Sequence, residues 1–163
     1  VIDRALLSLK SNDFPIYYLS PRGVKLDAQI SNSISKLDGM TLVCGKYEGV
    51  DERVIEHYNM IEISIGDYIL SGGDLAAMVL IDSVVRCLPN VLGNPLTLNE
   101  ESFTNHLLEY PLYTQPREWK NYKVPDVLLS GDHKKIKNWK IKQSEDITMK
   151  RRPDLWKKYL KLK

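Results

Sequence analysis

The chain has 163 residues, of which 43% are hydrophobic and 27% charged, and its formal net charge is +2. This is the composition of one globular domain, or of one domain with a small appendage, and it excludes disordered, collagen-like and low-complexity classes. The longest apolar run, residues 75–81, is far shorter than the roughly 20 residues of a membrane span, so we expect no membrane contact.

The first ninety residues predict alternating strands and helices. Short apolar runs rich in β-formers predict strands, and apolar residues at helical spacing predict helices between them. The predicted strands are 16–20, 41–45 and 61–65. The predicted helices are the end of a helix within 1–10, then about 27–37, 53–58 and 75–88. This order implies βαβ units, a parallel sheet and an α/β fold.

The pattern changes beyond Pro89, which ends the last of these helices. Residues 90–105 are polar and predict a loop or linker between two units. Three prolines between residues 111 and 125 predict an irregular stretch. Two helices then follow, one from Asp132 as its cap to about Gln143, and one from Pro153 to about Leu160.

The charge is divided unevenly between these parts. Residues 1–116 carry 8 Lys/Arg and 15 Asp/Glu, whereas residues 117–163 carry 15 Lys/Arg and 6 Asp/Glu. The asymmetry suggests a basic appendage that binds a polyanion, for which nucleic acid is the natural candidate; a solvated helix face is the alternative. Aromatic residues interleave with these charges, and we expect them to form the core of the appendage rather than to stack on bases. They are Trp119, Tyr122, Trp139, Trp156 and Tyr159.

Three glycine-bearing loops, residues 20–23, 45–49 and 66–73, follow the predicted strands. Ligands bind at the carboxyl edge of open parallel sheets, and glycine lets the backbone approach them closely. One such loop is an ordinary turn, but three together predict a mostly apolar, adenine-sized pocket. Neither GxGxxG nor GxxxxGK[ST] is present, which disfavours a nicotinamide oxidoreductase and a P-loop kinase.

Polar residues near the end of the apolar helix predict a second feature. Arg86 lies where burial is expected, so it must pair or face a site. The following loop carries Glu100 and Glu101, and a carboxylate near an arginine can perform acid–base chemistry. The alternative is a cation at a helix C-terminus and a solvated acidic pair.

The cysteines and histidines bear on redox and metal chemistry. Cys44 and Cys87 are too few for a disulfide scaffold, and both lie in apolar sequence. We therefore expect reduced core thiols and a cytoplasmic protein. The three histidines are far apart in the sequence, so no metal site is predicted. The chain starts at Val1 without a signal peptide, from which we expect a shortened N-terminus.

Seven stretches of the chain together point to one family. They are YYLSPRG (17–23), LVCGKYEGVDERVIE (42–56), ISIGDYILSGGD (63–74), LIDSVVRCLPNVLGN (80–94), SFTNHLLEYPLYTQP (102–116), VPDVLLSGDH (124–133) and RRPDL (151–155). In this order they closely resemble the bacterial tRNA (guanine-N1)-methyltransferases, the TrmD family. The match covers nearly the whole chain, which makes the resemblance highly specific.

The resemblance implies a domain organisation. Residues 1–93 are expected to form a SPOUT-type α/β domain with a parallel sheet and a deep trefoil knot, which binds S-adenosylmethionine. Residues 94–105 would be an interdomain catalytic loop, and residues 106–163 a small, mainly helical domain that binds tRNA. The family also implies a homodimer whose active site is shared between subunits.

The implied activity is methyl transfer from S-adenosylmethionine to N1 of the guanosine at position 37 of tRNA, next to the anticodon. Arg86 matches the family's catalytic arginine and Glu101 its catalytic aspartate. We expect Glu101 to accept the N1 proton and Arg86 to stabilise the charge on guanine O6. The expected cofactor contacts are Tyr18, Leu19, Ser20, Pro21, Gly45, Tyr47, Glu48, Gly49, Ile65, Gly66, Asp67, Tyr68, Ile69, Leu70, Gly72 and Gly73.

The chain departs from the family pattern at several positions. Glu101 replaces the catalytic aspartate, keeping the carboxylate and adding a methylene. Lys46 stands where arginine is usual and Asp74 where glutamate is, while Leu112 and Gln115 replace a histidine and an arginine. Two other functions stay open, namely a different SPOUT RNA methyltransferase and a non-catalytic RNA-binding dimer that keeps the fold.

Overall fold

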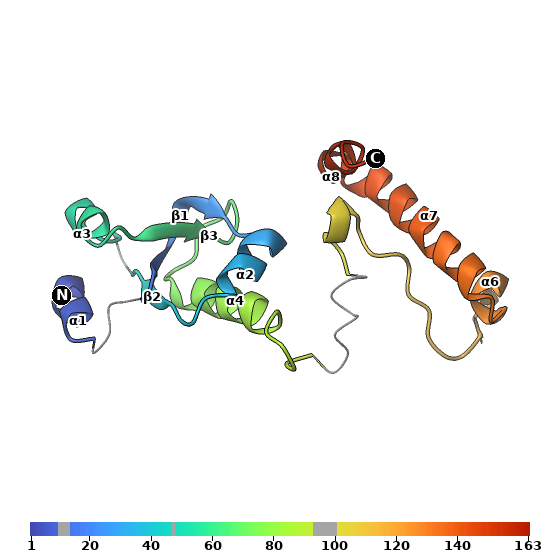
Figure 1. The fold of residues 1–163 in the computed structure, drawn as a ribbon, viewed down its shortest axis with the longest axis horizontal. Coiled ribbons are helices and arrows are strands. Elements are labelled where there is room, and N and C mark those ends of the chain that lie inside the picture. The colour runs from blue at the N-terminus through green and yellow to red at the C-terminus, as the bar shows by residue number, and fades with distance from the viewer. Residues whose placement is uncertain (10–13, 47, 93–100) are drawn as a thin grey trace. The chain divides into compact units, whose positions relative to one another are not determined.

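The computed structural model describes residues 1–9, 14–46, 48–92 and 101–163 (Figure 1). The chain divides into two compact units, Val1–Gly93 and Asn94–Lys163, and each is described by itself. Most of the predicted loop at 94–105 lies outside the described residues. Among the described helices, none combines the length and the apolar character that a membrane crossing requires.

The first unit is built on a three-stranded parallel sheet. Its strands are β1 (Ile16–Lys25), β2 (Thr41–Cys44) and β3 (Ile61–Ser64), in the order β2-β1-β3. In the centre of the sheet, Tyr17 aligns with Leu42 on one side and with Ile61 on the other. The predicted α/β fold with a parallel sheet is therefore confirmed.

Strand β1 is longer than the sequence predicted because its register shifts. Leu19 and Val24 both align with Ile63, so the residues between them form an excursion and the strand then rejoins β3. Gly23 makes this return possible, since a Cβ there would lie 2.3 Å from the carbonyl carbon of Glu62. The predicted end of this strand at residue 20 was wrong, since β1 continues to Lys25.

Four helices complete the first unit: α1 (Ile2–Leu7), α2 (Ala28–Ile34), α3 (Glu52–His57) and α4 (Asp74–Val85). Asp27 caps α2 by accepting a hydrogen bond from the backbone N–H of Ile30 at 2.9 Å, and such a bond satisfies one of the free donors at a helix start. The predicted helices at these four places are confirmed, each with ends shifted by a few residues.

Alternation along β1 directs neighbouring side chains to opposite faces of the sheet. Tyr17 and Leu19 pack with residues of α2 and α4, and the cluster is Tyr17, Leu19, Ile34, Ile63, Ala76, Ala77, Leu80 and Val84. Tyr18 faces α1 and α3, in a cluster of Leu6, Tyr18, Val43, Ile55 and Met60. Both faces of the sheet are thus covered, as parallel sheets require.

The second unit is mainly helical. It contains η1 (Thr104–His106), the antiparallel pair β4 (Glu118–Trp119) and β5 (Tyr122–Lys123), and the helices α6 (Asp126–Leu129), α7 (His133–Arg151) and α8 (Pro153–Tyr159). The hairpin and α6 lie in the stretch predicted as irregular. Each of these elements has only a few residues, which are too few to show a helical or strand periodicity in the sequence.

Helix α7 begins as predicted, because the Asp132 side chain accepts hydrogen bonds from the N–H groups of Lys134 and Lys135. Its predicted end at Gln143 was wrong, since the helix continues to Arg151. The added turns bury Ser144 and Thr148 within the unit. At the start of α8, Arg152 forms a two-pronged hydrogen bond with Asp154 at 2.9 and 2.6 Å.

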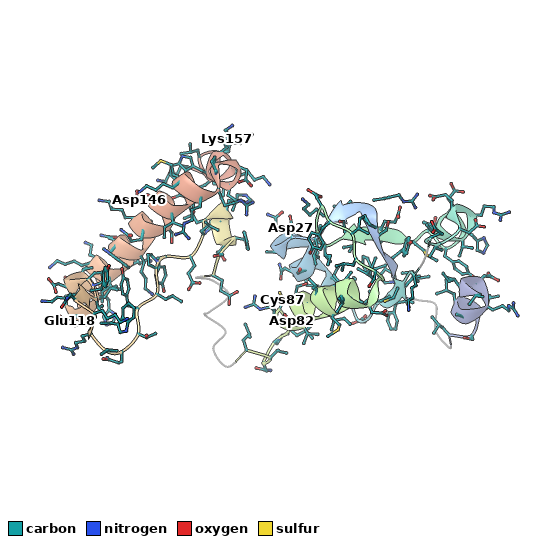
Figure 2. All side chains as sticks on the ribbon, turned by 180° about the vertical axis from the view of Figure 1, so that it is seen from behind. Asp27, Asp82, Cys87, Glu118, Asp146 and Lys157 are labelled. Carbon is teal, nitrogen blue, oxygen red and sulfur yellow. The ribbon has the colours of Figure 1, made fainter. Side chains whose placement is uncertain are left out.

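Neither cysteine belongs to the core, so the expectation of two core thiols was wrong. Cys44 is exposed at the end of β2, and Cys87 is half-buried just beyond α4 (Figure 2). Partial desolvation, and secondarily the charge of Asp74, raise the pKa of the Cys44 thiol. A raised pKa keeps this thiol protonated at neutral pH and hence poorly nucleophilic.

Candidate cofactor pocket and catalytic residues

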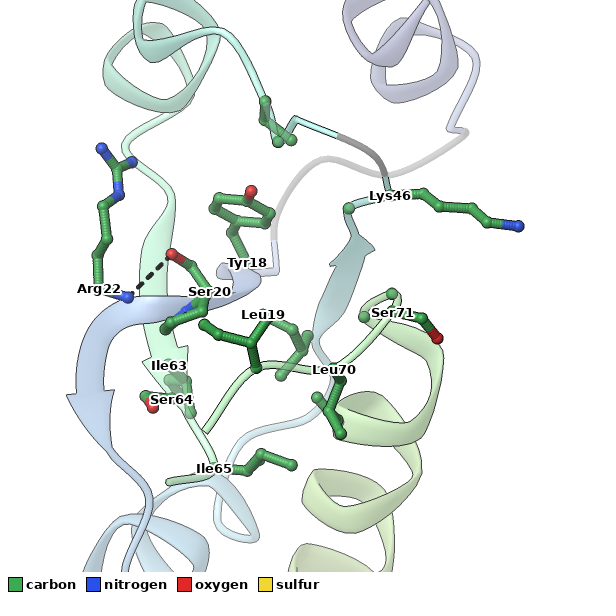
Figure 3. A pocket seen from close by; sticks show the side chains of 18 of the residues that line it. Tyr18, Leu19, Ser20, Arg22, Lys46, Ile63, Ser64, Ile65, Leu70 and Ser71 are labelled. Atoms are coloured by element: carbon green, nitrogen blue, oxygen red, sulfur yellow. Dashed lines mark hydrogen bonds between the residues drawn. The ribbon is translucent and has the colours of Figure 1, made fainter. Parts of the chain in front are cut away.

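The three glycine-bearing loops lie side by side at the carboxyl edge of the sheet, where they line a pocket of about 390 Å³ (Figure 3). This volume falls within the range of roughly 300–1,000 Å³ that is typical of small-molecule and cofactor sites. All of its lining residues belong to the first unit. The first unit alone therefore supplies every residue that lines this pocket.

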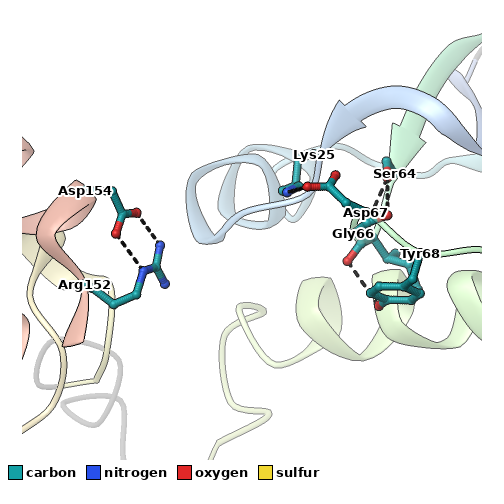
Figure 4. Close-up of polar contacts among 8 residues, drawn as sticks. Lys25, Ser64, Gly66, Asp67, Tyr68, Arg152 and Asp154 are labelled. Atoms are coloured by element: carbon teal, nitrogen blue, oxygen red, sulfur yellow. Dashed lines mark hydrogen bonds and ion pairs between the residues drawn. The ribbon is translucent and has the colours of Figure 1, made fainter.

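Fourteen of the expected cofactor contacts line this pocket. They are Tyr18, Leu19, Ser20, Pro21, Gly45, Glu48, Gly49, Ile65, Gly66, Tyr68, Ile69, Leu70, Gly72 and Gly73. Asp67 does not line it, because its carboxylate pairs with the Lys25 ammonium at 2.7 Å (Figure 4). Tyr47 lies outside the described residues. That any of these residues binds a cofactor remains a prediction.

The pocket has further walls that the sequence analysis did not assign. The additional lining residues are Arg22, Lys46, Val50, Ile63, Ser64, Ser71 and Ala76. Arg22, Lys46 and Ser71 lie inside the three predicted loops, so assigning every residue of those loops to the pocket would have included them. Ile63, Ser64 and Ala76 belong to β3 and α4, where the pattern indicated only core, and nothing in the sequence marks them as pocket residues.

Glycines allow two of the loops to touch. The N–H of Gly73 donates to the carbonyl of Gly45 at 2.8 Å. A Cβ at Gly73 would lie 2.9 Å from the Cα of Cys44, and one at Gly45 would lie 3.0 Å from the Tyr18 ring. Backbone, rather than side chains, therefore forms this wall, which leaves amide and carbonyl groups close to whatever occupies the pocket.

A buried serine shapes the loop that follows β3. The Ser64 hydroxyl donates to the Gly66 carbonyl at 3.1 Å and accepts from the Gly66 N–H at 3.2 Å (Figure 4). The Tyr68 hydroxyl donates to the Ile65 carbonyl at 3.3 Å. A Cβ at Gly66, whose φ is +155°, would lie 2.4 Å from the Tyr68 ring. These contacts hold the Tyr68 ring against the backbone of the turn.

The lining combines buried apolar side chains with exposed charges. Leu19, Ile63 and Ala76 are buried, whereas Arg22, Lys46 and Glu48 are exposed. Figure 3 shows Lys46 directed away from the labelled apolar side chains. An apolar interior with a few polar groups suits a flat, aromatic ligand that carries charge at one end.

Two glutamates hold Arg22 beside the pocket. Its guanidinium contacts Glu52 at 3.0 Å and Glu62 at 3.1 Å. Hydrogen bonds to Glu52 and Glu62, in that order of size, raise the pKa of Arg22. Arg22 and Glu52 are exposed, whereas Glu62 is half-buried. Exposed ion pairs add little stability, so these contacts orient the arginine more than they stabilise the fold.

The predicted catalytic pair is divided between the two units. Arg86 is half-buried at the C-cap of α4 and is not among the residues that line the pocket. Glu101 is half-buried in the second unit, just before η1. Their catalytic roles therefore remain predictions that the fold of either unit does not test.

The segment that begins at Glu101 has an unusual backbone. Phe103, Asn105 and His106 have φ values of 78°, 51° and 62°, and such left-handed conformations are uncommon outside glycine. The N–H of Phe103 donates to the Leu107 carbonyl at 2.6 Å, which closes a tight loop. Backbone strain of this kind clusters at functional sites.

A buried threonine ties this loop to α7. Thr148 has no exposed surface. Its hydroxyl accepts a hydrogen bond from the Leu108 N–H at 2.8 Å and donates to the Ser144 carbonyl at 2.6 Å. The Ser102 hydroxyl also accepts from the Glu109 N–H at 3.0 Å. Hence the loop is held at both of its ends.

Metal ligands are not gathered anywhere in the described parts of the chain. Across these ranges, no three His, Cys, Asp or Glu side chains come together as a metal ion would need.

Comparison with known proteins identifies the family. The family model described as tRNA (Guanine-1)-methyltransferase TrmD matches residues 1–158. The chain belongs to the TrmD family. The predicted family is thus confirmed, and the chain comes from a family of tRNA methyltransferases rather than of nicotinamide oxidoreductases.

Three curated TrmD relatives illustrate the similarity, and each is called tRNA (guanine-N(1)-)-methyltransferase. The Pelagibacter ubique protein is 54% identical over 161 residues, which are 99% of this chain and 71% of that protein. The Ruegeria pomeroyi protein is 52% identical over 149 residues, covering 91% of this chain and 61% of that protein. The Rhodospirillum rubrum protein is 51% identical over 160 residues, which are 98% of this chain and 67% of that protein. The chain spans about two thirds of the length of these TrmD proteins.

Proposed function

We propose that this chain forms part of a TrmD enzyme that transfers the methyl group of S-adenosylmethionine to N1 of guanosine 37 in tRNA. The observation that carries the proposal is the TrmD match over residues 1–158, on a chain whose glycine loops line a cofactor-sized pocket. A cytoplasmic location is proposed with it, since the tRNA substrate is found there.

We propose a division of labour between the parts of the chain. Residues 1–93 would be the knotted SPOUT-type domain that binds the cofactor, and residues 106–163 the domain that binds tRNA. Residues 94–105 would join them as the catalytic loop. The uneven charge supports this division, because the 15 Lys/Arg residues at 117–163 suit a polyanion.

The pocket residues fit S-adenosylmethionine. Gly45 and Gly73 let two loops and the Tyr18 ring approach one another closely, so backbone rather than side chains forms this wall of the pocket. Leu19, Ile63 and Ala76 supply apolar contacts for the adenine ring. Glu48 is an acidic side chain on the described rim, and its charge suits a cationic cofactor.

The proposed mechanism follows from the chemistry of guanine. N1 is a poor nucleophile while protonated, so its proton must leave as the new N1–carbon bond forms. Glu101 accepts this proton, and Arg86 stabilises the negative charge that grows on O6. When bound, S-adenosylmethionine supplies an electrophilic methyl whose bonding electrons return to a neutral thioether sulfur. The pocket residues hold the reactants in line, which can contribute several kcal/mol through orientation.

A homodimer belongs to the same proposal. Helix α4 buries one side against the sheet, while its other side exposes five apolar side chains, with the exposed Asp82 among them. The exposed side chains are Leu75, Met78, Val79, Ile81 and Val85. An apolar face of this kind marks a protein interface, and a second copy that covers it would bring a partner subunit close to Arg86. Sedimentation of the full-length protein as a monomer would contradict the dimer.

A methyl-transfer assay on two tRNA transcripts tests the proposed function. The full-length protein is expected to methylate a transcript with guanosine at position 37 and to leave a transcript with adenosine there unmodified. Methylation at a different nucleotide would favour another SPOUT RNA methyltransferase. Binding of S-adenosylmethionine without transfer to either transcript would favour the non-catalytic RNA-binding dimer.

Neutralising the first turns of α7 is expected to weaken tRNA binding. Lys134, Lys135 and Lys137 are exposed there, and each phosphate contact adds about 0.9 to the slope of log affinity against log salt on duplex nucleic acid. The triple glutamine variant should therefore bind tRNA less tightly and with a shallower salt dependence. Lys36→Gln, an exposed site in the first unit, is the control. An unchanged slope in the triple variant would reduce these lysines to a solvated face.

A further inference from the structure

The hairpin of the second unit is a small, well-defined element. Strands β4 and β5 are joined by Lys120 and Asn121, whose φ values are 47° and 68°. Two successive residues with positive φ form the turn that best matches the twist of a hairpin. Trp119 and Tyr122 flank the turn as a directly opposed cross-strand pair.

The two aromatic rings of this pair are exposed. Trp119 is 58% and Tyr122 75% accessible to solvent. Their centroids are 6.4 Å apart and the planes meet at 28°, so the rings lie nearly parallel. The expectation that these residues form a core was wrong, because a hairpin this short has nothing beneath it to cover them.

The other tryptophans of the unit behave differently. Trp139 is half-buried against Tyr113 at 6.3 Å, and Trp156 is half-buried beside Tyr159 at 5.4 Å. These two tryptophans are partly buried, unlike the pair in the hairpin. Only the hairpin pair, among the described tryptophan contacts, leaves most of its aromatic surface to solvent.

Positive charge surrounds the exposed rings. The Lys120 ammonium lies 4.9 Å from the centroid of the Trp119 ring. Lys123 stands on the adjoining strand, where it contacts Glu118 at 3.7 Å. A partner that is flat, aromatic and attached to phosphate satisfies both features at once, whereas an apolar protein groove would leave the lysine charge unmatched. The charge therefore favours RNA over protein.

We propose that the Trp119–Tyr122 face of the hairpin stacks on an unpaired base of the tRNA substrate, with Lys120 placed for the neighbouring phosphate. This inference rests on the proposed function, because it assumes tRNA as the ligand. Proteins read unpaired RNA by stacking its bases on aromatic side chains. Such stacking tolerates any base, since every base has a π-face.

Substitution of the stacking pair gives the first test. Binding of a tRNA transcript with guanosine at position 37 is measured over a series of salt concentrations. The Trp119→Ala/Tyr122→Ala variant of the full-length protein should bind roughly 5- to 150-fold more weakly, which is the usual range for loss of one stacked base, with an unchanged salt slope. Trp119→Phe, which keeps an aromatic ring, should retain most of the affinity.

Two outcomes of that test would overturn the inference. Unchanged affinity would show that the hairpin does not stack on tRNA and would favour another partner, such as a protein. Weaker binding with a shallower salt slope, like that expected of the α7 lysine variant, would make the contact electrostatic rather than stacked. Absence of methyl transfer by the wild-type enzyme would instead refute the proposed function, which is a separate measurement.

A second measurement keeps the native hairpin intact. In a background in which every other tryptophan of the full-length protein is replaced by phenylalanine, Trp139 and Trp156 of this chain among them, the fluorescence of Trp119 reports on the hairpin alone. Addition of the same transcript should quench the indole and shield it from acrylamide. Unaltered emission and accessibility at saturating tRNA would overturn the inference even if the alanine variant fails to fold.

Discussion

Replacing Glu101 by glutamine is expected to slow methyl transfer to tRNA by roughly 10²–10⁴-fold, the usual worth of a general base. The amide has nearly the same shape as the carboxylate but cannot accept the N1 proton at neutral pH. Binding of S-adenosylmethionine should be unaffected, because Glu101 is not among the residues that line the pocket. Single-turnover kinetics, together with calorimetric titration of the cofactor, would separate the two effects.

Two variants serve as controls for this result. Glu101→Asp introduces the residue that the family resemblance implies at this position and keeps the carboxylate, so it should retain most of the activity. Glu109→Gln removes a charge from the same segment without touching the proposed base, and it should behave like the wild type. A fully active Glu101→Gln enzyme would remove this carboxylate from the mechanism.

Replacing Gly23 by alanine is expected to destabilise the first unit by about 3 kcal/mol, the upper part of the usual range for inserting atoms into a packed site. The new Cβ would lie 2.3 Å from the carbonyl carbon of Glu62 and 2.4 Å from the N of Ile63. Both are backbone atoms of β3, so neither can move aside as the end of a flexible side chain could. The return of β1 to β3 should therefore be lost, and the Ser20 side of the pocket with it.

Urea unfolding and amide hydrogen exchange along β1 and β3 would measure this loss. Gly72→Ala is the matched control, because its Cβ would meet nothing closer than 3.6 Å. That variant should keep the stability of the wild type to within about 1 kcal/mol, as expected for a substitution without a clash. If both variants unfold alike, the close approach at Gly23 is not what holds the two strands together.

The sequence located the elements of the first unit because each has a local signal. The runs at 41–44 and 61–64 are bounded by turn residues, and apolar residues at helical spacing mark the helix at 28–34. The excursion of β1 has no such signal. Pro21 and Gly23 form turns in most contexts, and only the approach of β3, some forty residues later, turns them into part of a strand.

The candidate site divides in the same way. Loops at the carboxyl edge of a parallel sheet predicted most of the pocket, since topology alone brings those edges together. Asp67 was predicted to line the pocket, but it pairs instead with Lys25 of another strand, and nothing in the sequence indicates that ion pair. The sequence context marked Arg86 and the acidic pair Glu100 and Glu101 as candidates, but the choice of Glu101 as the base and of Arg86 as its partner rests on the family resemblance.

The buried hydroxyl of Thr148 has a mechanical consequence. Through Leu108 it fastens the strained loop after Glu101 to the C-terminal end of α7, the helix whose first turns carry Lys134, Lys135 and Lys137. The segment that follows Glu101 is thus hydrogen-bonded to the same helix that carries the lysines. In the proposed mechanism, a tilt of α7 on RNA binding would also move the Glu101 carboxylate and would couple proton removal to substrate binding.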